Sequence, residues 1–146
     1  MGKICLLQVS EMNNSQTIEK ILAETKTIAV VGFSASQSRA GYYVPAYLKE
    51  QGYRIIPVNP HIQAGLGQQA YPNLLVVPEP VDLVLIFRQP RKVPPSVEEA
   101  ITIGAKAVWM QLGIVHETAA AQARAAGLDV VMDACMLVEH RNRKRK

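Results

Sequence analysis

One stretch, Thr27–Asn59, constrains the fold of this 146-residue chain more than any other. It opens with an apolar run that ends at Gly32, and a loop of small and polar residues follows before apolar positions recur at helical spacing. We expect this helix to begin between Tyr43 and Pro45, because proline is tolerated in a first helical turn and not later. A second apolar run covers residues 53–58. The order strand, loop, helix, strand predicts a parallel crossover, with a ligand site beyond the carboxyl ends of its strands.

The alternation of strands and helices continues to residue 132. Strands are predicted at 81–87, 106–111 and 128–132, and helices from residue 15, from Pro94 to Gly104 and from Glu117 to Ala126. Such a chain favours an α/β fold: a three-layer, doubly wound parallel sheet of about five strands, Rossmann-type, in the order 3-2-1-4-5. In that order the first and fourth strands are neighbours, and the chain continues from them toward opposite edges of the sheet. The switch point therefore lies between these two strands. Residues 32–34 and 111–113 would then flank one crevice.

Length and charge favour a single domain over residues 1–140. Residues 1–13 form an N-terminal arm whose role stays open, and residues 141–146 form a basic tail with five of the 16 positive charges. Without the tail the balance is 11 − 12 = −1, so we expect no specific nucleic-acid surface. Cys5 and Cys135 suggest reduced thiols and a cytoplasmic protein. No apolar run is long enough to span a bilayer, so we expect no membrane association.

The residues of the crevice indicate which class of nucleotide ligand it suits. A dinucleotide fingerprint would place three glycines after the first strand and a carboxylate after the second. This chain keeps only Gly32 of the glycine series, and its second strand ends at Asn59. An uncharged amide would not repel a phosphate on the adenosine ribose, whereas a carboxylate would. The site therefore suits a phosphorylated adenosine better than NAD, and the missing Walker sequence argues against NTP hydrolysis.

Several motifs in order resemble those of the small stand-alone CoA-binding proteins, which are similar to the CoA-binding domain of succinyl-CoA synthetase alpha subunits. The matching motifs span about residues 27–141 and are Ile28-Ala29-Val30-Val31-Gly32-Phe33-Ser34, Gly52-Tyr53-Arg54-Ile55-Ile56-Pro57-Val58-Asn59-Pro60, Phe87-Arg88 with Pro90, and Trp109-Met110-Gln111-Leu112-Gly113-Ile114. The chain departs from the pattern at Ala35, Ala40, Gly41 and Ala134, where the family commonly has proline, proline, serine and arginine.

The resemblance implies a binding role for thirteen residues of the crevice. Gly32, Phe33 and Ser34 would lie against the pyrophosphate, with Arg39 available to a phosphate, and Asn59 and Pro60 would border the adenosine ribose. Phe87, Arg88, Pro90 and Val93 would enclose the adenine end, and Gln111, Leu112 and Gly113 would lie along the pantetheine or pyrophosphate. The implied ligand is coenzyme A or an acyl-CoA.

Three functions stay open from the residues themselves. The first is CoA binding in a regulatory, carrier or accessory role without catalysis, since no catalytic constellation or metal-ligand spacing is evident. The second is an enzyme that uses NAD(P) or another adenine nucleotide. The third is an interaction or nucleic-acid-binding protein that works through its basic tail. Cys135 is either a buried small side chain or a partner for the CoA thiol, and both a homodimer and an unidentified protein partner stay open.

Overall fold

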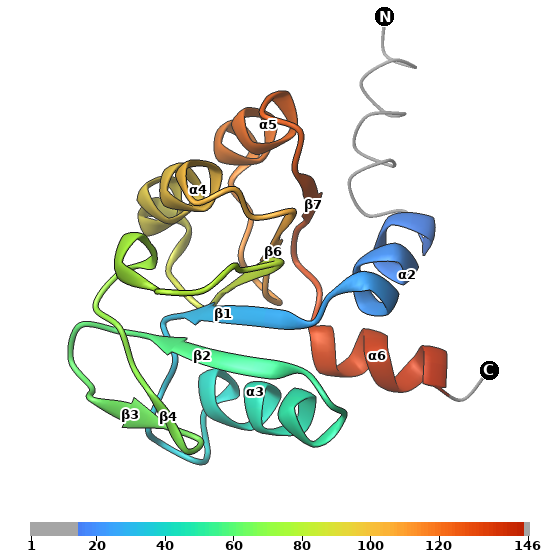
Figure 1. Ribbon diagram of the computed structural model, residues 1–146. Helices are drawn as coiled ribbons and strands as arrows, with labels where there is room; N and C mark the ends of the chain where they lie inside the picture. Colours follow the sequence, from blue (N-terminus) through green and yellow to red (C-terminus); the bar gives the residue numbers. More distant parts are fainter. Residues whose placement is uncertain (1–14, 145–146) are drawn as a thin grey trace, which may run out of the picture.

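The computed structural model describes residues 15–144, and the N-terminal arm at 1–13 lies outside the described residues (Figure 1). Five parallel strands form the central sheet, in the order β2-β1-β5-β6-β7. Their bounds are β1 Thr27–Val31, β2 Arg54–Val58, β5 Leu83–Ile86, β6 Ala107–Met110 and β7 Asp129–Val131. The helices are α2 Ser15–Glu24, α3 Ala40–Glu50, α4 Val93–Thr102, α5 Glu117–Ala125 and α6 Met136–Lys144, with short 3₁₀ helices η1 Leu74–Val76 and η2 Pro90–Lys92.

The predicted α/β class is confirmed, because the sheet is parallel throughout and helices cover both faces. Figure 1 shows α4 and α5 on one side of the sheet and α2, α3 and α6 on the other. Side chains of β1 alternate between these layers: Ala29 and Val31 pack toward α4 and α5, whereas Ile28 and Val30 pack toward α2 and α3. Burial on both faces explains why the strands are continuously apolar.

The predicted strand order 3-2-1-4-5 is wrong. Counting only the five strands of the central sheet, the order is 2-1-3-4-5, because β5 pairs with β1. The connection from β2 to β5 passes over the face that α4 and α5 cover, where Leu74 of η1 is fully buried. Right-handed crossovers over opposite faces move the chain in opposite directions across a sheet. The chain therefore returns past β1, and the switch point lies between β1 and β5.

Helix α3 begins at Ala40, earlier than the predicted start at Tyr43 to Pro45, and Pro45 lies inside it. A proline cannot donate an N–H to the carbonyl four residues earlier, which here belongs to Gly41. That carbonyl instead accepts the N–H of Ser34 at 3.2 Å. Because Pro45 makes no bond to the Gly41 carbonyl, that carbonyl can accept a hydrogen bond from the loop. The proline is therefore tolerated beyond the first turn of α3.

Residues 141–144, assigned by the sequence analysis to a basic tail, form the last turn of α6. Arg143 is largely buried there, pairing with Glu139 at 2.9 Å and donating to Ser15 Oγ at 3.1 Å. The bond to Ser15 and an ion pair with Glu19 at 3.9 Å attach α6 to α2. No helix within residues 15–144 is both long and apolar enough to cross a membrane.

A small hairpin that the sequence analysis did not predict lies after β2. Its strands are β3 Ala64–Gly65 and β4 Gln68–Gln69, paired antiparallel. A side chain at Gly65 would collide with the ring of Phe33, which is only 1% exposed. The hairpin therefore covers Phe33 and holds the chain that follows β1 against the protein body.

Candidate functional site

The site begins at a turn that only glycine can make. Gly32 follows β1 with φ +84°, and a Cβ there would lie 2.5 Å from the carbonyl oxygen of Phe87, just after β5. Its N–H donates to the Val58 carbonyl at the end of β2, at 3.0 Å. Three strand ends thus meet at Gly32, with the β1 and β5 backbones in direct contact at the switch point.

The loop after Gly32 is fastened to the first turn of α3. Besides the Ser34 N–H to Gly41 carbonyl bond, the Ser34 Oγ accepts the Ser36 N–H at 3.1 Å. Gly41 is buried, and a Cβ there would lie 3.0 Å from the Gly32 carbonyl oxygen. The N–H groups of Ala40 and Gly41 have no acceptor among the described residues. Free N–H groups at a helix start attract an anion.

These elements enclose a crevice of about 570 Å³ at the carboxyl edge of the sheet. Its lining comes from the loop after β1, the first turn of α3, and the segments after β5, β6 and β7. The lining residues are Gly32, Ser34, Arg39, Ala40, Gly41, Tyr43, Phe87, Arg88, Gln89, Gln111, Leu112, Ile114 and Cys135. Residues after the first and fourth strands therefore share one crevice, although β5 lies between these strands.

Seven of the thirteen predicted site residues line this crevice: Gly32, Ser34, Arg39, Phe87, Arg88, Gln111 and Leu112. The side chains of Phe33 and Val93 lie in the core, and neither residue lines the crevice. Pro60, Pro90 and Gly113 are exposed but outside the lining.

Asn59 also lies outside the lining, and its amide is engaged at both ends. The Nδ2 donates to the Phe33 carbonyl at 2.8 Å, and the Oδ1 accepts the His61 N–H at 2.8 Å. Asn59 therefore fixes the loops after β1 and β2 to each other. A spacing argument could not distinguish this role from contact with a ribose.

The charge of the crevice is positive. Arg39 and Arg88 line it, and neither pairs with a carboxylate among the described residues. The described lining contains no aspartate or glutamate. A cavity with unpaired cations and free backbone N–H groups is suited to an anionic ligand.

The far end of the crevice combines apolar and polar side chains. Leu112 is 68% exposed at its rim, whereas Gln111 is only 4% exposed and its Oε1 accepts the Met136 N–H at 3.2 Å. Cys135, a free thiol just before α6, is partly buried beside them. Six lining residues were not among the thirteen predicted, although Cys135 had been considered as a partner for the CoA thiol: Ala40, Gly41, Tyr43, Gln89, Ile114 and Cys135.

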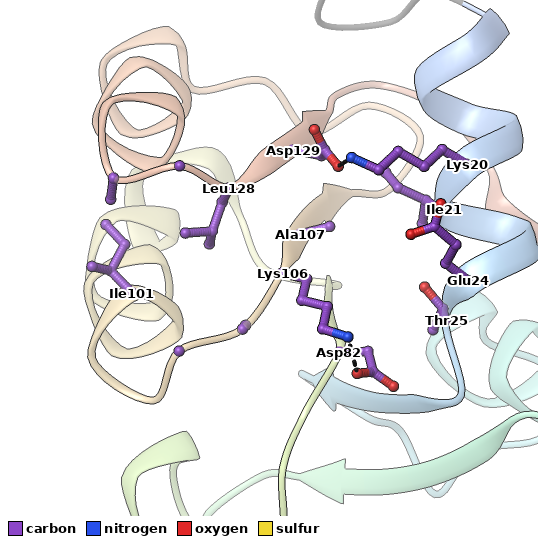
Figure 2. Close-up of a pocket in the computed structure, with 14 residues that line it drawn as sticks. Lys20, Ile21, Glu24, Thr25, Asp82, Ile101, Lys106, Ala107, Leu128 and Asp129 are labelled. Carbon is purple, nitrogen blue, oxygen red and sulfur yellow. Dashed lines mark ion pairs between the residues drawn. The ribbon is translucent and has the colours of Figure 1, made fainter.

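A separate cavity of about 450 Å³ lies at the opposite, amino-terminal edge of the sheet (Figure 2). Its two lysines are paired: Lys20 with Asp129 at 3.1 Å, and Lys106 with Asp82 at 3.6 Å. Burial alone would raise the pKa of Asp82, but the N–H groups of Thr27 and Lys26 together with Lys106 hold that pKa below its ordinary value. These charges join the ends of β5 and β6 to each other and α2 to β7, so the crevice is the better candidate site.

The chain is similar to proteins of known sequence and structure. An uncharacterized protein of Bacillus subtilis, YneT, is 38% identical over 123 residues, covering 84% of this chain and 91% of the relative. A solved protein structure from Thermus thermophilus is 40% identical with a TM-score of 0.84, covering 88% of this chain and 98% of that one.

A larger relative is ADP-forming acetate–CoA ligase II of Archaeoglobus fulgidus, which is 33% identical over 95 residues. The match covers 63% of this chain but only 14% of the ligase. The profile of the CoA binding domain family matches residues 26–141, which include the whole crevice and all strands of the central sheet. The chain belongs to the CoA binding domain family.

Proposed function

We propose that the chain binds coenzyme A or an acyl-CoA in the crevice at the carboxyl ends of the strands. One observation carries this proposal: Ala40 and Gly41, whose N–H groups have no acceptor among the described residues, line one cavity with the unpaired Arg39 and Arg88 beside the Gly32 turn. This arrangement suits a pyrophosphate. Membership of the CoA binding domain family supports the same ligand.

The ligand would lie across the switch point. Its pyrophosphate would contact Gly32, the Phe33 backbone and Ser34, with Arg39 beside it. The pantetheine arm would pass Gln111, Leu112 and Gly113 toward Cys135, which places the thiol of CoA at the partly buried end of the crevice. The adenosine would lie on the other side of Arg88, near Asn59, Pro60, Phe87, Pro90 and the backbone of Val93.

The proposed role is regulatory, carrier or accessory, in the cytoplasm, without catalysis by this chain. The described lining offers a thiol and hydroxyl groups but no histidine or carboxylate to act as a general base. Within residues 15–144, no three His, Cys, Asp or Glu side chains come together as a metal site. Incubation with acetyl-CoA should therefore release free CoA no faster than buffer does.

Thermal melting with added CoA tests the binding proposal. Because a ligand that binds only the folded state stabilises it, the melting temperature should rise steadily with CoA concentration. Arg39→Gln should reduce the rise by removing a cation from the crevice. Arg141→Gln removes an exposed cation from α6 and should leave the rise unchanged. A flat response to CoA together with a rise for NAD or NADP would favour the adenine-nucleotide enzyme instead.

A further inference from the structure

Apolar side chains gather at the end of the crevice near Cys135, where the proposed function places the thiol of CoA. Leu112 and Tyr43 are 68% and 48% exposed, and both line the crevice. Ile114, a third apolar lining residue, is only partly buried. We call these three residues the apolar rim. Scattered exposed apolar side chains need no explanation, whereas a group of them at one cavity indicates a place that a ligand covers.

The contacts between α3 and α6 place Tyr43 at this end of the crevice. The Tyr47 hydroxyl of α3 lies 2.9 Å from Nδ1 of His140 in α6. One turn later in both helices, Lys144 donates to Gln51 Oε1 at 2.9 Å. The two helices therefore run in parallel. One turn in the other direction brings Tyr43 to the start of α6, and the residue just before α6 lines the crevice as well.

Leu112 is held at the rim by a turn that is itself fixed. The Ile114 N–H donates to the Gln111 carbonyl at 2.9 Å and so closes a turn that has Leu112 at its tip. Asp133 fixes this turn twice. Its Oδ1 accepts the Gly113 N–H at 2.7 Å, and its own N–H donates to the Ile114 carbonyl at 3.1 Å. The exposure of Leu112 is therefore built into the fold.

A buried amide group beside the apolar rim has a free donor. Gln111 lines the crevice and is only 4% exposed, and its Oε1 accepts the Met136 N–H at 3.2 Å. Its Nε2 makes no hydrogen bond with a described residue. Buried polar groups are nearly always hydrogen-bonded, so this group is available to an acceptor in the crevice. The sulfur of free CoA is a weak acceptor, whereas the carbonyl oxygen of a thioester is a good one.

Among the described residues, no charged side chain lines this end of the crevice. The lining here has no aspartate, glutamate, lysine, arginine or histidine and consists of Tyr43, Gln111, Leu112, Ile114 and Cys135. In the proposed function Arg39 lies beside the pyrophosphate. The carboxylate of Asp133, bonded to the turn at Gly113, would repel a second carboxylate. This end therefore suits an uncharged apolar group better than an acidic one.

We infer that the crevice takes an acyl-CoA whose acyl group is short, aliphatic and uncharged. The acyl chain lies between Tyr43 and Leu112, and the thioester carbonyl accepts a hydrogen bond from Gln111 Nε2. The chain is short because the apolar rim covers only a few carbon atoms before the crevice opens to solvent. This inference rests on the proposed function and names its ligand class, an acylated CoA bound in preference to free CoA.

Titration calorimetry with CoA, butyryl-CoA and succinyl-CoA tests the inference, because the two acyl groups have equal numbers of carbons and differ in a carboxylate. The wild-type chain should bind butyryl-CoA roughly tenfold to a hundredfold more tightly than CoA, since apolar carbons are buried and a hydrogen bond is added. Succinyl-CoA should show no such preference. A double variant, Y43Q with L112Q, should lose most of the preference for butyryl-CoA. Both side chains are exposed, so the fold should survive.

The matched control is L75Q with V76Q, because these apolar side chains are 54% and 51% exposed but lie outside the crevice. This variant should keep the preference. Equal affinity of the wild type for CoA and butyryl-CoA would overturn the acyl-group inference and leave the proposed function intact. A preference retained in full by Y43Q/L112Q, or shown equally for succinyl-CoA, would overturn it as well. Binding of none of the three compounds would overturn the proposed function itself.

Discussion

At the scale of single residues, Gly32 combines two constraints. Its positive φ is costly for any residue with a Cβ, and the space that a Cβ would need is filled by the Phe87 carbonyl group. The first constraint recurs at other turns of the chain. Among the described glycines with a positive φ, the second arises only at Gly32, where the β1 and β5 backbones meet at the floor of the crevice.

Substitution of Gly32 tests whether this contact matters beyond backbone strain. Gly104→Ala is the matched control, because Gly104 has a similar φ of +76° and no atom within 4 Å of the added Cβ. We expect Gly104→Ala to lower the free energy of unfolding by about 1–2 kcal/mol through strain alone. Gly32→Ala should cost a further 1–3 kcal/mol or so, because the Phe87 segment must move.

Urea unfolding of both variants measures the difference, and CoA titration of the folded proteins should show weaker binding for Gly32→Ala only. Equal costs in the two variants would mean that the Phe87 segment yields freely. The close packing of β1 against β5 would then not be a constraint on the crevice.

The sequence identified residues of the crevice better than it identified the direction of their side chains. Gly32, Ser34, Arg88 and Gln111 were predictable because each follows a buried strand at its carboxyl end. The core position of Phe33 was not, since it depends on the hairpin at Gly65, which is distant in sequence. The two internal hydrogen bonds of Asn59 likewise depend on tertiary contacts.

At the scale of elements, α6 is attached through His140. The imidazole Nδ1 lies 2.9 Å from the Tyr47 hydroxyl of α3, and the ring packs edge-on against Tyr53. Burial lowers the pKa of His140, and nearby Lys144 lowers it further. The folded protein therefore holds this histidine neutral where an unfolded chain would already bind a proton.

This difference predicts a pH dependence for the docking of α6. A histidine whose pKa is lowered by folding stabilises the protein at pH above its unfolded pKa, about 6.5. Its contribution is lost as the pH falls through the folded pKa. We expect His140→Phe, which keeps a ring but cannot titrate, to flatten the loss of stability between about pH 7 and 5.

Urea unfolding across this pH range is the measurement. His61→Gln, at an exposed histidine, should keep the wild-type slope. His140→Phe should also lose roughly 0.5–1.5 kcal/mol at neutral pH, because the Tyr47 hydroxyl loses its partner. A wild-type slope in His140→Phe would show that other groups control the acid response.

The elements themselves were largely predictable, and their arrangement was only partly so. Apolar runs and proline positions located the strands of the sheet and the helices between them. The position of β5 was not predictable, because it depends on which face Leu74 packs against, and a 3₁₀ turn shows no periodicity that reveals this. The start of α3 was missed because the Gly41 carbonyl finds its donor in a separate loop. No helix was predicted after residue 132, so α6 was missed, and its last residues, 141–144, were assigned to a basic tail.

At the scale of the whole molecule, the two edges of the sheet differ in how their charges are used. The two lysines of the amino-edge cavity, Lys20 and Lys106, are paired with aspartates, whereas Arg39, Arg88, Arg91 and Lys92 at the carboxyl edge have no ion pair with a described residue. The net charge of +4 is therefore less informative than its placement. Unpaired cations collect at the edge where parallel α/β sheets bind ligands.

Hydrogen exchange of the whole chain, with and without CoA, should reveal this division. A ligand lying from Pro90 to Cys135 should slow amide exchange at residues 32–41, 87–92 and 111–114, beyond the uniform slowing that added stability gives to the core. Residues 104–107 and 126–129, at the amino-edge cavity of Figure 2, should show only the uniform effect.

The opposite pattern would be equally informative. Selective protection of residues 104–107 and 126–129 would place the ligand in the amino-edge cavity, where Lys20 and Lys106 would have to leave their aspartates to meet a phosphate. Such an exchange would break two ion pairs, one between the ends of β5 and β6 and one between α2 and β7, whereas binding at the carboxyl edge would break none. The carboxyl edge should therefore prevail.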